Sequence, residues 1–283
     1  MTNLNANPSI TPNTNFNLKP EPDCPPKAGL GASLRTWPDL PQIRVIPCDN
    51  RLQIKVDPAT CPPIDSDAVA ARWATLCAAN PRYHDGAILA VSAIDAEPNE
   101  PVTITCRHDW YRRLAVQPQV RTGVRLLGVT AVLLSHDDAG VPSVLLARRG
   151  NSVRVYPNQW ELGPSGGVNV PPANIALLSR ADLARAALDE IEEEIGPQAA
   201  ALLGGPESLS TIAIIRDDAA NSDDIILLAQ APAPATVRAA IQTTWEYSQS
   251  QWVQIDAIPA WDQEHAQQTL HCTRAIFRVM GWT

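Results

Sequence analysis

The chain has 283 residues, of which 45% are hydrophobic and 18% charged, a composition typical of a folded protein with a substantial apolar core. The acidic side chains number 30 and the basic ones 22, which gives a net charge of −8 and argues against binding nucleic acid through bulk electrostatics. No apolar run approaches the roughly 18 to 20 residues that a membrane-spanning helix needs, and the first residues lack the features of a secretory signal. We therefore expect a cytoplasmic protein whose partners are small molecules, with no nucleic acid and no membrane among them.

The first part of the chain is predicted to hold a tail and a small α+β extension. Residues 1–36 are rich in Asn, Thr and Pro, and we expect them to be disordered, because they can bury too little apolar surface to offset the entropy of ordering. The extension is expected over residues 37–122. It should contain a hairpin made by 43–48 and 51–56, a helix over 65–79, strands over 87–94 and 102–106, and a short helix over 108–116.

The second part, residues 123–283, is predicted to be an α/β domain. Leucine-rich and β-branched strands are expected over 124–136 and 143–150, followed by a Gly/Pro-rich loop. A helix should begin at the capping box formed by Ser179 and Asp182 and end at Gly196, which precedes a proline. Further strands are expected over 209–217, 224–230 and 250–256, and a terminal helix over 264–280.

Three carboxylates lie on one face of the helix that follows the capping box. Glu190, Glu193 and Glu194 have the i, i+3, i+4 spacing, at which like charges destabilise an isolated helix by roughly 0.2 to 0.5 kcal/mol per pair. They also stand at the C-terminal end, where the helix dipole disfavours anions. A hard divalent cation bound through the carboxylate oxygens would remove both penalties. The alternative is an acidic face exposed to solvent.

This helix and the segments before it resemble the Nudix hydrolase superfamily, whose motif is G-x5-E-x7-R-E-U-x-E-E-x-G-U with U apolar. The residues that match the second half of the motif are Glu190, Ile191, Glu193, Glu194 and Gly196. Residues 146–149 and 160–167 resemble the strand and glycine-rich turn that precede it, and the resemblance covers about residues 123–280. The sequence departs from the motif in three places. The first motif glutamate has no counterpart in register, Asp189 replaces the arginine, and Pro197 replaces the last apolar residue.

The resemblance implies a Nudix-type α/β/α sandwich with a mixed sheet. A subgroup that acts on UDP-sugars is similar in its N-terminal extension, its longer loop after the glycines and its lack of the motif arginine. This implies hydrolysis of a nucleoside diphosphate-sugar, with UDP-sugars such as UDP-glucose favoured, to a nucleoside monophosphate and a sugar phosphate. Two alternatives remain open. The substrate could be another diphosphate, such as ADP-ribose, a dinucleotide or a prenyl diphosphate. Alternatively, the chain could be a catalytically inactive Nudix-fold module with a ligand-binding or regulatory role.

The resemblance also implies roles for the acidic residues. Glu190, Glu193 and Glu194 would bind Mg²⁺ or Mn²⁺ and take part in catalysis, since bridging metal ions neutralise a diphosphate and lower the pKa of bound water. Glu246, expected in the loop before the last strand, is the first candidate for the general base. Asp223 and Asp224 are further candidates, and each could equally be an ordinary loop acid.

Glycines, arginines and aromatic residues complete the expected site. Gly166 and Gly167 would let the backbone approach metal and phosphate closely, or would form a plain turn. Arg148 and Arg149 end a strand that faces this loop, and at least one could hold a phosphate; a surface position is the alternative for each. The aromatic residues that could stack on a uracil ring, or simply belong to the core, are Trp73, Tyr83, Trp110 and Tyr111.

Overall fold

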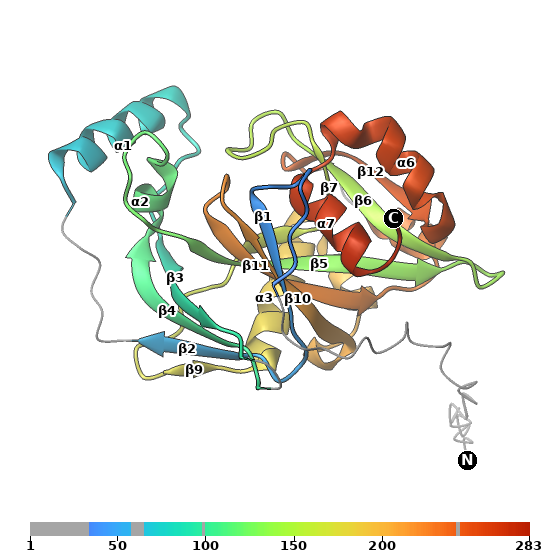
Figure 1. The fold of residues 1–283 in the computed structure, drawn as a ribbon. Helices are drawn as coiled ribbons and strands as arrows, with labels where there is room; N and C mark the ends of the chain where they lie inside the picture. The colour runs from blue at the N-terminus through green and yellow to red at the C-terminus, as the bar shows by residue number, and fades with distance from the viewer. Residues whose placement is uncertain (1–33, 58–64, 98–99, 242–243) are drawn as a thin grey trace, which may run out of the picture.

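The computed structural model describes residues 34–57, 65–97, 100–241 and 244–283 (Figure 1). Residues 1–33 of the predicted tail lie outside the described residues, and Arg35 forms an antiparallel bridge with Val45. The strands are β1 Ile43–Pro47, β2 Gln53–Asp57, β3 Ala87–Asp95, β4 Thr103–Trp110, β5 Leu126–His136, β6 Pro142–Arg149, β7 Trp160–Leu162, β8 Ser165–Gly167, β9 Leu177–Leu178, β10 Leu209–Asp217, β11 Ser222–Gln230 and β12 Tyr247–Gln254. The α-helices are α1 Asp67–Ala79, α2 Tyr111–Ala115, α3 Arg180–Glu194, α4 Pro197–Leu202, α5 Pro234–Ala240, α6 Ile258–His265 and α7 His271–Val279.

The described strands join into one mixed sheet of 12 strands. Its main path runs β1-β10-β11-β5-β3-β4-β2-β9. Off this path, β6 and β8 pair with β5, and β7 and β12 pair with β6. The pairs β11–β5 and β2–β4 are parallel. Strands from both predicted parts of the chain therefore belong to one sheet, in which β3 meets β5 through the pair Ala90 and Leu126.

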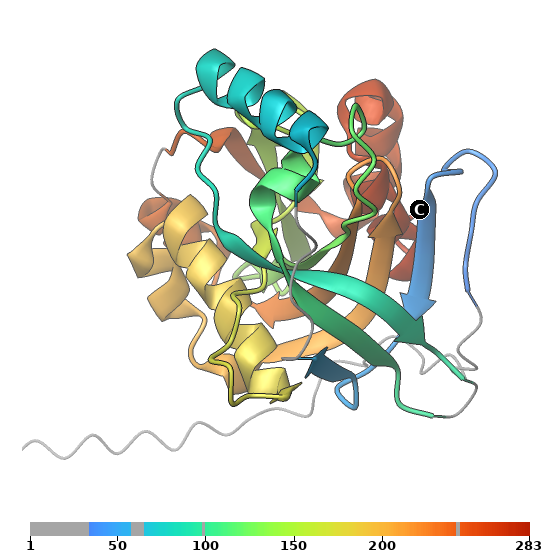
Figure 2. The ribbon, with the colours of Figure 1, turned by 90° about the vertical axis from the view of Figure 1, so that its left-hand side faces the viewer.

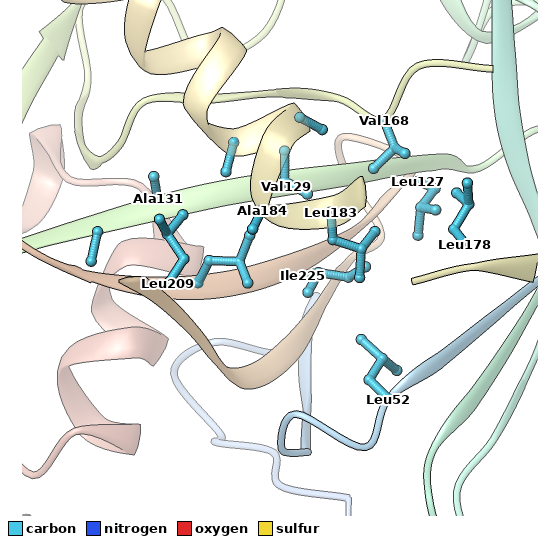
Figure 3. Packing of buried hydrophobic residues seen from close by; sticks show 14 of the residues in the cluster. Leu52, Leu127, Val129, Ala131, Val168, Leu178, Leu183, Ala184, Leu209 and Ile225 are labelled. Carbon is cyan, nitrogen blue, oxygen red and sulfur yellow. The ribbon is translucent and has the colours of Figure 1, made fainter. Parts of the chain in front are cut away.

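Helices cover both faces of the central strands, which gives the α/β/α layering. Along β5, Leu127, Val129 and Ala131 belong to the core cluster under α3, to which Leu183 and Ala184 contribute from the helix (Figure 3). The opposite face packs against α7, whose Ala275, Ile276 and Phe277 are buried with residues of β10 and β11. Burial on both faces explains why this strand is a nearly continuous apolar run. Figure 2 shows α1, the blue-green helix, set apart from α3 above β3 and β4.

The helix α3 forms as the sequence predicts. Its capping box is complete, because the Ser179 side chain accepts from the Asp182 N–H and the Asp182 carboxylate accepts from the Ser179 N–H at 2.8 Å. At the other end Gly196 has φ of 129°, in the region that favours glycine, and its N–H reaches the Ile191 carbonyl at 2.9 Å. The described residues contain no helix long and apolar enough to cross a membrane.

The predicted hairpin between 43–48 and 51–56 is wrong. Strand β1 pairs with β10, and β2 pairs with β4 and β9. The reason is that the two strands bury their side chains in different clusters: Ile43 and Val45 pack near α7, whereas Ile54 and Val56 pack in the cluster under α3. The turn after β1 is held to β10 instead, since the Thr211 N–H donates to Asn50 Oδ1 at 2.9 Å.

Two predicted helix boundaries also differ from the structure. The single helix expected over 264–280 is divided into α6 and α7, because Thr269 bridges Trp160 of β7 and the Leu270 N–H donates to the Trp160 carbonyl at 2.9 Å. The helix expected over 108–116 begins only at Tyr111, because β4 continues through Trp110 by pairing with Ala87 of β3. In both places a strand contact distant in sequence replaces local helical hydrogen bonds.

Candidate functional site

A pocket of about 570 Å³ opens between the segment after α1, the loop from β6 to β7, the C-terminal half of α3 and the loop before β12. Its volume lies within the range of sites for small molecules. Of the residues that the sequence singles out, it brings together Glu190, Glu193, Glu194, Glu246, Arg149, Gly166, Gly167 and Asp224, with Tyr83 and Tyr111.

Glu190 lies directly against Gly166. A Cβ on this glycine would stand 2.0 Å from the Glu190 carboxyl carbon, so only glycine leaves room for the carboxylate. Gly167 differs, because a Cβ there would meet only Leu126 at 3.5 Å, an ordinary contact. Burial and then the charges of Glu193, Glu246 and Asp189 together raise the pKa of Glu190 to about 7. Among the described residues, no Lys, Arg or His forms an ion pair with this carboxylate.

Glu194 is the most buried of the three helix glutamates that the sequence singles out, with 6% of its surface exposed. It accepts a hydrogen bond from the Ser165 N–H at 3.1 Å. The pKa of Glu194 lies well above the usual range. Burial is the largest cause, and the hydrogen bond with Glu246 and the charges of Glu161, Glu246 and Glu190 raise the pKa in the same direction. Glu246 thus lies beside Glu194 although 52 positions separate them in the sequence, because its loop precedes β12, the partner of β6.

The remaining acids of the helix lie at its exposed side. Glu193 lines the rim of the pocket and is exposed, and Asp189 is exposed as well. No ion pair joins Arg185 to Asp189 in the described part of the chain. The aspartate that replaces the motif arginine therefore lies outside the buried part of the cluster.

The two arginines at the end of β6 point in different directions. The Arg149 Nη1 forms an ion pair of 2.6 Å with Glu161 Oε1, and the Tyr247 hydroxyl donates to the same oxygen at 2.8 Å. Arg148 does not line the pocket, and its Nε donates to the Asn158 carbonyl at 3.1 Å. Sequence reasoning missed Glu161, which is 3% exposed. The available signal was a charged residue between the apolar Trp160 and Leu162 of a three-residue strand.

Aromatic rings and two arginines from outside α3 form another wall of the pocket. Tyr83 and Tyr111 line the pocket with ring centroids 6.4 Å apart, and Trp73 packs edge-on against both. Trp110 is 38% exposed and lies outside the pocket. Arg82 stacks over Trp245 at 4.8 Å and Arg154 over Tyr111 at 5.9 Å.

The two aspartates named as further base candidates lie on opposite faces of β11. Asp223 is fully buried and paired with Arg216 at 2.6 Å and with Arg125 at 3.2 Å. Asp224 lines the pocket, and its pKa is raised to about 7. Burial is the main cause, a hydrogen bond from Ser222 opposes it, and the charges of Asp217, Asp223 and Glu161 add to it. The alternation of side chains along a strand therefore assigns Asp223 to the framework and Asp224 to the pocket.

The acidic side chains around the pocket form an open set of oxygen donors. In the described ranges, no three His, Cys, Asp or Glu side chains converge so that they could hold a metal ion by themselves. The donors present at the helix are carboxylate oxygens, which hard divalent cations prefer. Mg²⁺ commonly uses one or two protein carboxylates together with water and substrate phosphates. The chemistry of Glu190 and Glu194 therefore fits such an ion without a closed protein cage.

Comparison with known proteins gives partial structural likenesses. No family model and no curated protein matches the sequence. Among solved structures, a NUDIX hydrolase from Alicyclobacillus acidocaldarius matches 55% of this chain and 90% of its own, with 15% identity and a TM-score of 0.39. The DR0079 protein of Deinococcus radiodurans matches 58% of this chain and 85% of its own at 17% identity and TM-score 0.37. An Ap4A hydrolase of C. elegans matches 56% of this chain and 93% of its own, with 16% identity and a TM-score of 0.35. Any activity must therefore be argued from the residues of the pocket.

Proposed function

We propose that this protein hydrolyses the diphosphate of a nucleoside diphosphate-sugar, with UDP-sugars favoured, to a nucleoside monophosphate and a sugar phosphate, and that it uses Mg²⁺ or Mn²⁺. The observation that carries the proposal is the pair of carboxylates Glu190, which is half-buried, and Glu194, which is buried; their pKa values are raised and they line a pocket of about 570 Å³. Uncompensated carboxylates in such a place are typical of functional sites.

The electrostatics of the pocket support a cation between the carboxylates and an anionic substrate. The charge of Glu246 raises the pKa values of Glu190 and Glu194, and the charge of Glu190 raises that of Glu194. These carboxylates would therefore repel a diphosphate unless positive charge is supplied. Glu190 and Glu194 would hold the ion, with Glu193 at the exposed rim. When bound, it would neutralise the diphosphate and lower the pKa of the attacking water.

The protein's own groups would bind and orient the rest of the substrate. Arg82 and Arg154 line the pocket and form no ion pair with an acid in the described segments. Arg82 Nη1 donates to the Ser152 hydroxyl at 2.9 Å, and the other donors of the two guanidinium groups could hold phosphate oxygens. Arg149 is a weaker candidate, because Glu161 already occupies its Nη1. The rings of Tyr83 and Tyr111 offer apolar surface on which a base would pack.

Glu246 is the proposed general base. It lines the pocket on a loop rather than on α3, and it is hydrogen bonded with Glu194. With the cation bound at Glu194, Glu246 would take the proton of the attacking water. Gly166 would hold open the space in which Glu190 lies.

The test is a substrate panel with the full chain. UDP-glucose, ADP-ribose, a dinucleoside polyphosphate and a prenyl diphosphate are incubated with Mg²⁺, with Mn²⁺ and with EDTA. The proposal predicts the highest kcat/KM for the UDP-sugar and no turnover in EDTA. A higher kcat/KM for another diphosphate would correct the substrate, and tight binding without turnover of any compound would make the chain a binding module.

A further inference from the structure

The pocket extends beyond the glutamate cluster into a chamber on the other face of the sheet. Here we call it the aspartate chamber, and it is bounded by Asp217, Ser222, Asp224, Thr130 and Tyr156. Its residues come from β5, β10, β11 and the loop before β7, and α7 lies across it. Neither the predicted metal site nor the aromatic wall uses this chamber.

Two glycines on adjacent strands place the aspartate chamber next to the glutamate cluster. Asp224 lies against Gly128 of β5, where a Cβ would stand 2.1 Å from its Oδ1. The same Cβ position is 3.2 Å from the carbonyl oxygen of Gly166, against which Glu190 lies. Neighbouring strands are about 4.8 Å apart, so the chamber begins roughly one strand spacing from the glutamates. A group attached directly to a diphosphate held at Glu190 would reach it.

The acids of the chamber differ in how fully they are hydrogen bonded. Asp217 accepts from the Tyr156 hydroxyl at 2.7 Å and from the N–H groups of Ala219 and Ala220 at 2.8 and 3.1 Å. Asp224 accepts from the Ser222 hydroxyl at 2.6 Å, and the described residues give it no other hydrogen bond. A carboxylate has about four acceptor positions, so Asp224 can accept more hydrogen bonds from a ligand.

Thr130 provides a second and independent sign of a ligand. It is 7% exposed and lines the pocket, and its hydroxyl has no hydrogen-bond partner among the described residues. Thr130 stands two positions after Gly128 on β5, so it projects to the same face as Asp224. The hydroxyl itself is not fully buried, so it is accessible from the pocket. An incoming hydroxyl could both donate to it and accept from it.

We infer that the aspartate chamber is the subsite for the sugar of the substrate, with hydroxyl groups of the sugar donating to Asp224 and exchanging hydrogen bonds with Thr130. This inference rests on the proposed function and adds to it the position and the recognition of the glycosyl group. The sugar and the base would then lie in opposite parts of the pocket, with the diphosphate between them.

The hydrogen-bond donors and acceptors of the sugar and of the base indicate which of the two occupies the aspartate chamber. A sugar presents several hydroxyl donors, which charged carboxylates accept well. Uracil presents two carbonyl acceptors, which carboxylates repel, and one N–H donor. The aromatic wall of Tyr83 and Tyr111 offers the opposite environment, with flat rings and nearby guanidinium donors from Arg82 and Arg154. The chamber therefore fits the sugar, and the wall fits the base.

The experiment compares two substrates that differ only in the sugar. These are UDP-glucose and the P2-methyl ester of UDP, and kcat/KM is measured with Mg²⁺ for the wild-type chain and for Asp224→Asn, Thr130→Val and Asp218→Asn. Asp218 is a matched control, since it is exposed, lies outside the pocket and pairs with Arg44. The specificity ratio of UDP-glucose over the methyl ester should fall roughly tenfold in Asp224→Asn and a few-fold in Thr130→Val, and should keep the wild-type value in Asp218→Asn. A melting curve of each variant checks that it folds.

The outcomes separate this inference from the proposed function. If the wild-type chain hydrolyses UDP-glucose but the ratio is near one, or if both chamber variants leave the ratio unchanged, the sugar subsite is refuted while the hydrolase proposal stands. A variant that slows both substrates equally also refutes it, because Asp224 would then act on the reaction rather than on the sugar. If the wild-type chain hydrolyses neither compound, the proposed function fails, and the inference fails with it.

Discussion

The substitution Gly166→Ala should remove activity without unfolding the protein. The new Cβ would stand 2.0 Å from the Glu190 carboxyl, whereas ordinary contact begins near 3.4 Å, so the carboxylate must move by about 1.4 Å. A displacement of about 1 Å at a reacting centre costs on the order of a hundredfold in rate. We therefore expect kcat/KM for UDP-glucose to fall at least about a hundredfold.

The same substitution should not lower stability at neutral pH. The pKa of Glu190 rises from 4.5 to about 7 in the folded chain, so its ionisation opposes folding above pH 4.5 and fully above pH 7. At 1.36 kcal/mol per pKa unit the opposing free energy is between about 3 and 4 kcal/mol at most. Moving the carboxylate toward water releases part of it and offsets the strain of the new methyl group.

Gly167→Ala is the matched control, because a Cβ there meets only Leu126 Cδ1 at 3.5 Å. Its kcat/KM should stay within about threefold of wild type. The assays are steady-state hydrolysis in Mg²⁺ and urea unfolding at pH 5 and pH 8. Equal activity of the two alanine variants would refute the reasoning, since Glu190 would then not need its place against Gly166.

The other predictions concern the carboxylates and the cation. Glu194→Gln should lower turnover at least about a hundredfold by removing a charged metal ligand, whereas Asp189→Asn, at an exposed position, should stay within about tenfold; comparable losses in a hydrolysis assay would mean that the aspartate acts at the metal. Asp224→Asn should gain stability over wild type as the pH rises from about 4 to 7, because the pKa of Asp224 is raised from 3.8 to about 7 and its ionisation opposes folding; a pH-independent difference in urea unfolding would contradict this. Mg²⁺ should raise the melting temperature of the wild-type chain and not that of a Glu190→Gln, Glu194→Gln double variant, and an equal shift in both would place the ion elsewhere.

Local signals made α3 and its carboxylates predictable from the sequence. The capping box at Ser179, the glycine at 196 and the spacing of Glu190 and Glu194 all act within a few residues of one another. The helix therefore forms where the sequence predicts it. The burial of Glu194, by contrast, depends on Glu246 and on Ser165, which other elements bring to it.

Contacts between strands that are distant in the sequence could not be predicted. The hairpin prediction failed because β1 and β2 find partners more than 40 residues away. Asp223 and Asp224 are equivalent in the sequence, and only the position of β11 inside the sheet decides which one faces the pocket. Glu161 was missed because a strand of three residues has too little pattern to reveal a buried charge.

The most direct test of the central claim is to follow the products by ³¹P NMR. UDP-glucose is incubated with the full chain in Mg²⁺, in EDTA, and in Mg²⁺ with the Glu190→Gln, Glu194→Gln double variant. We expect equal amounts of UMP and glucose 1-phosphate with the wild-type chain and Mg²⁺, and neither product in the other two samples. Formation of the same products by the double variant, or UDP and free glucose in place of UMP and glucose 1-phosphate, would contradict it.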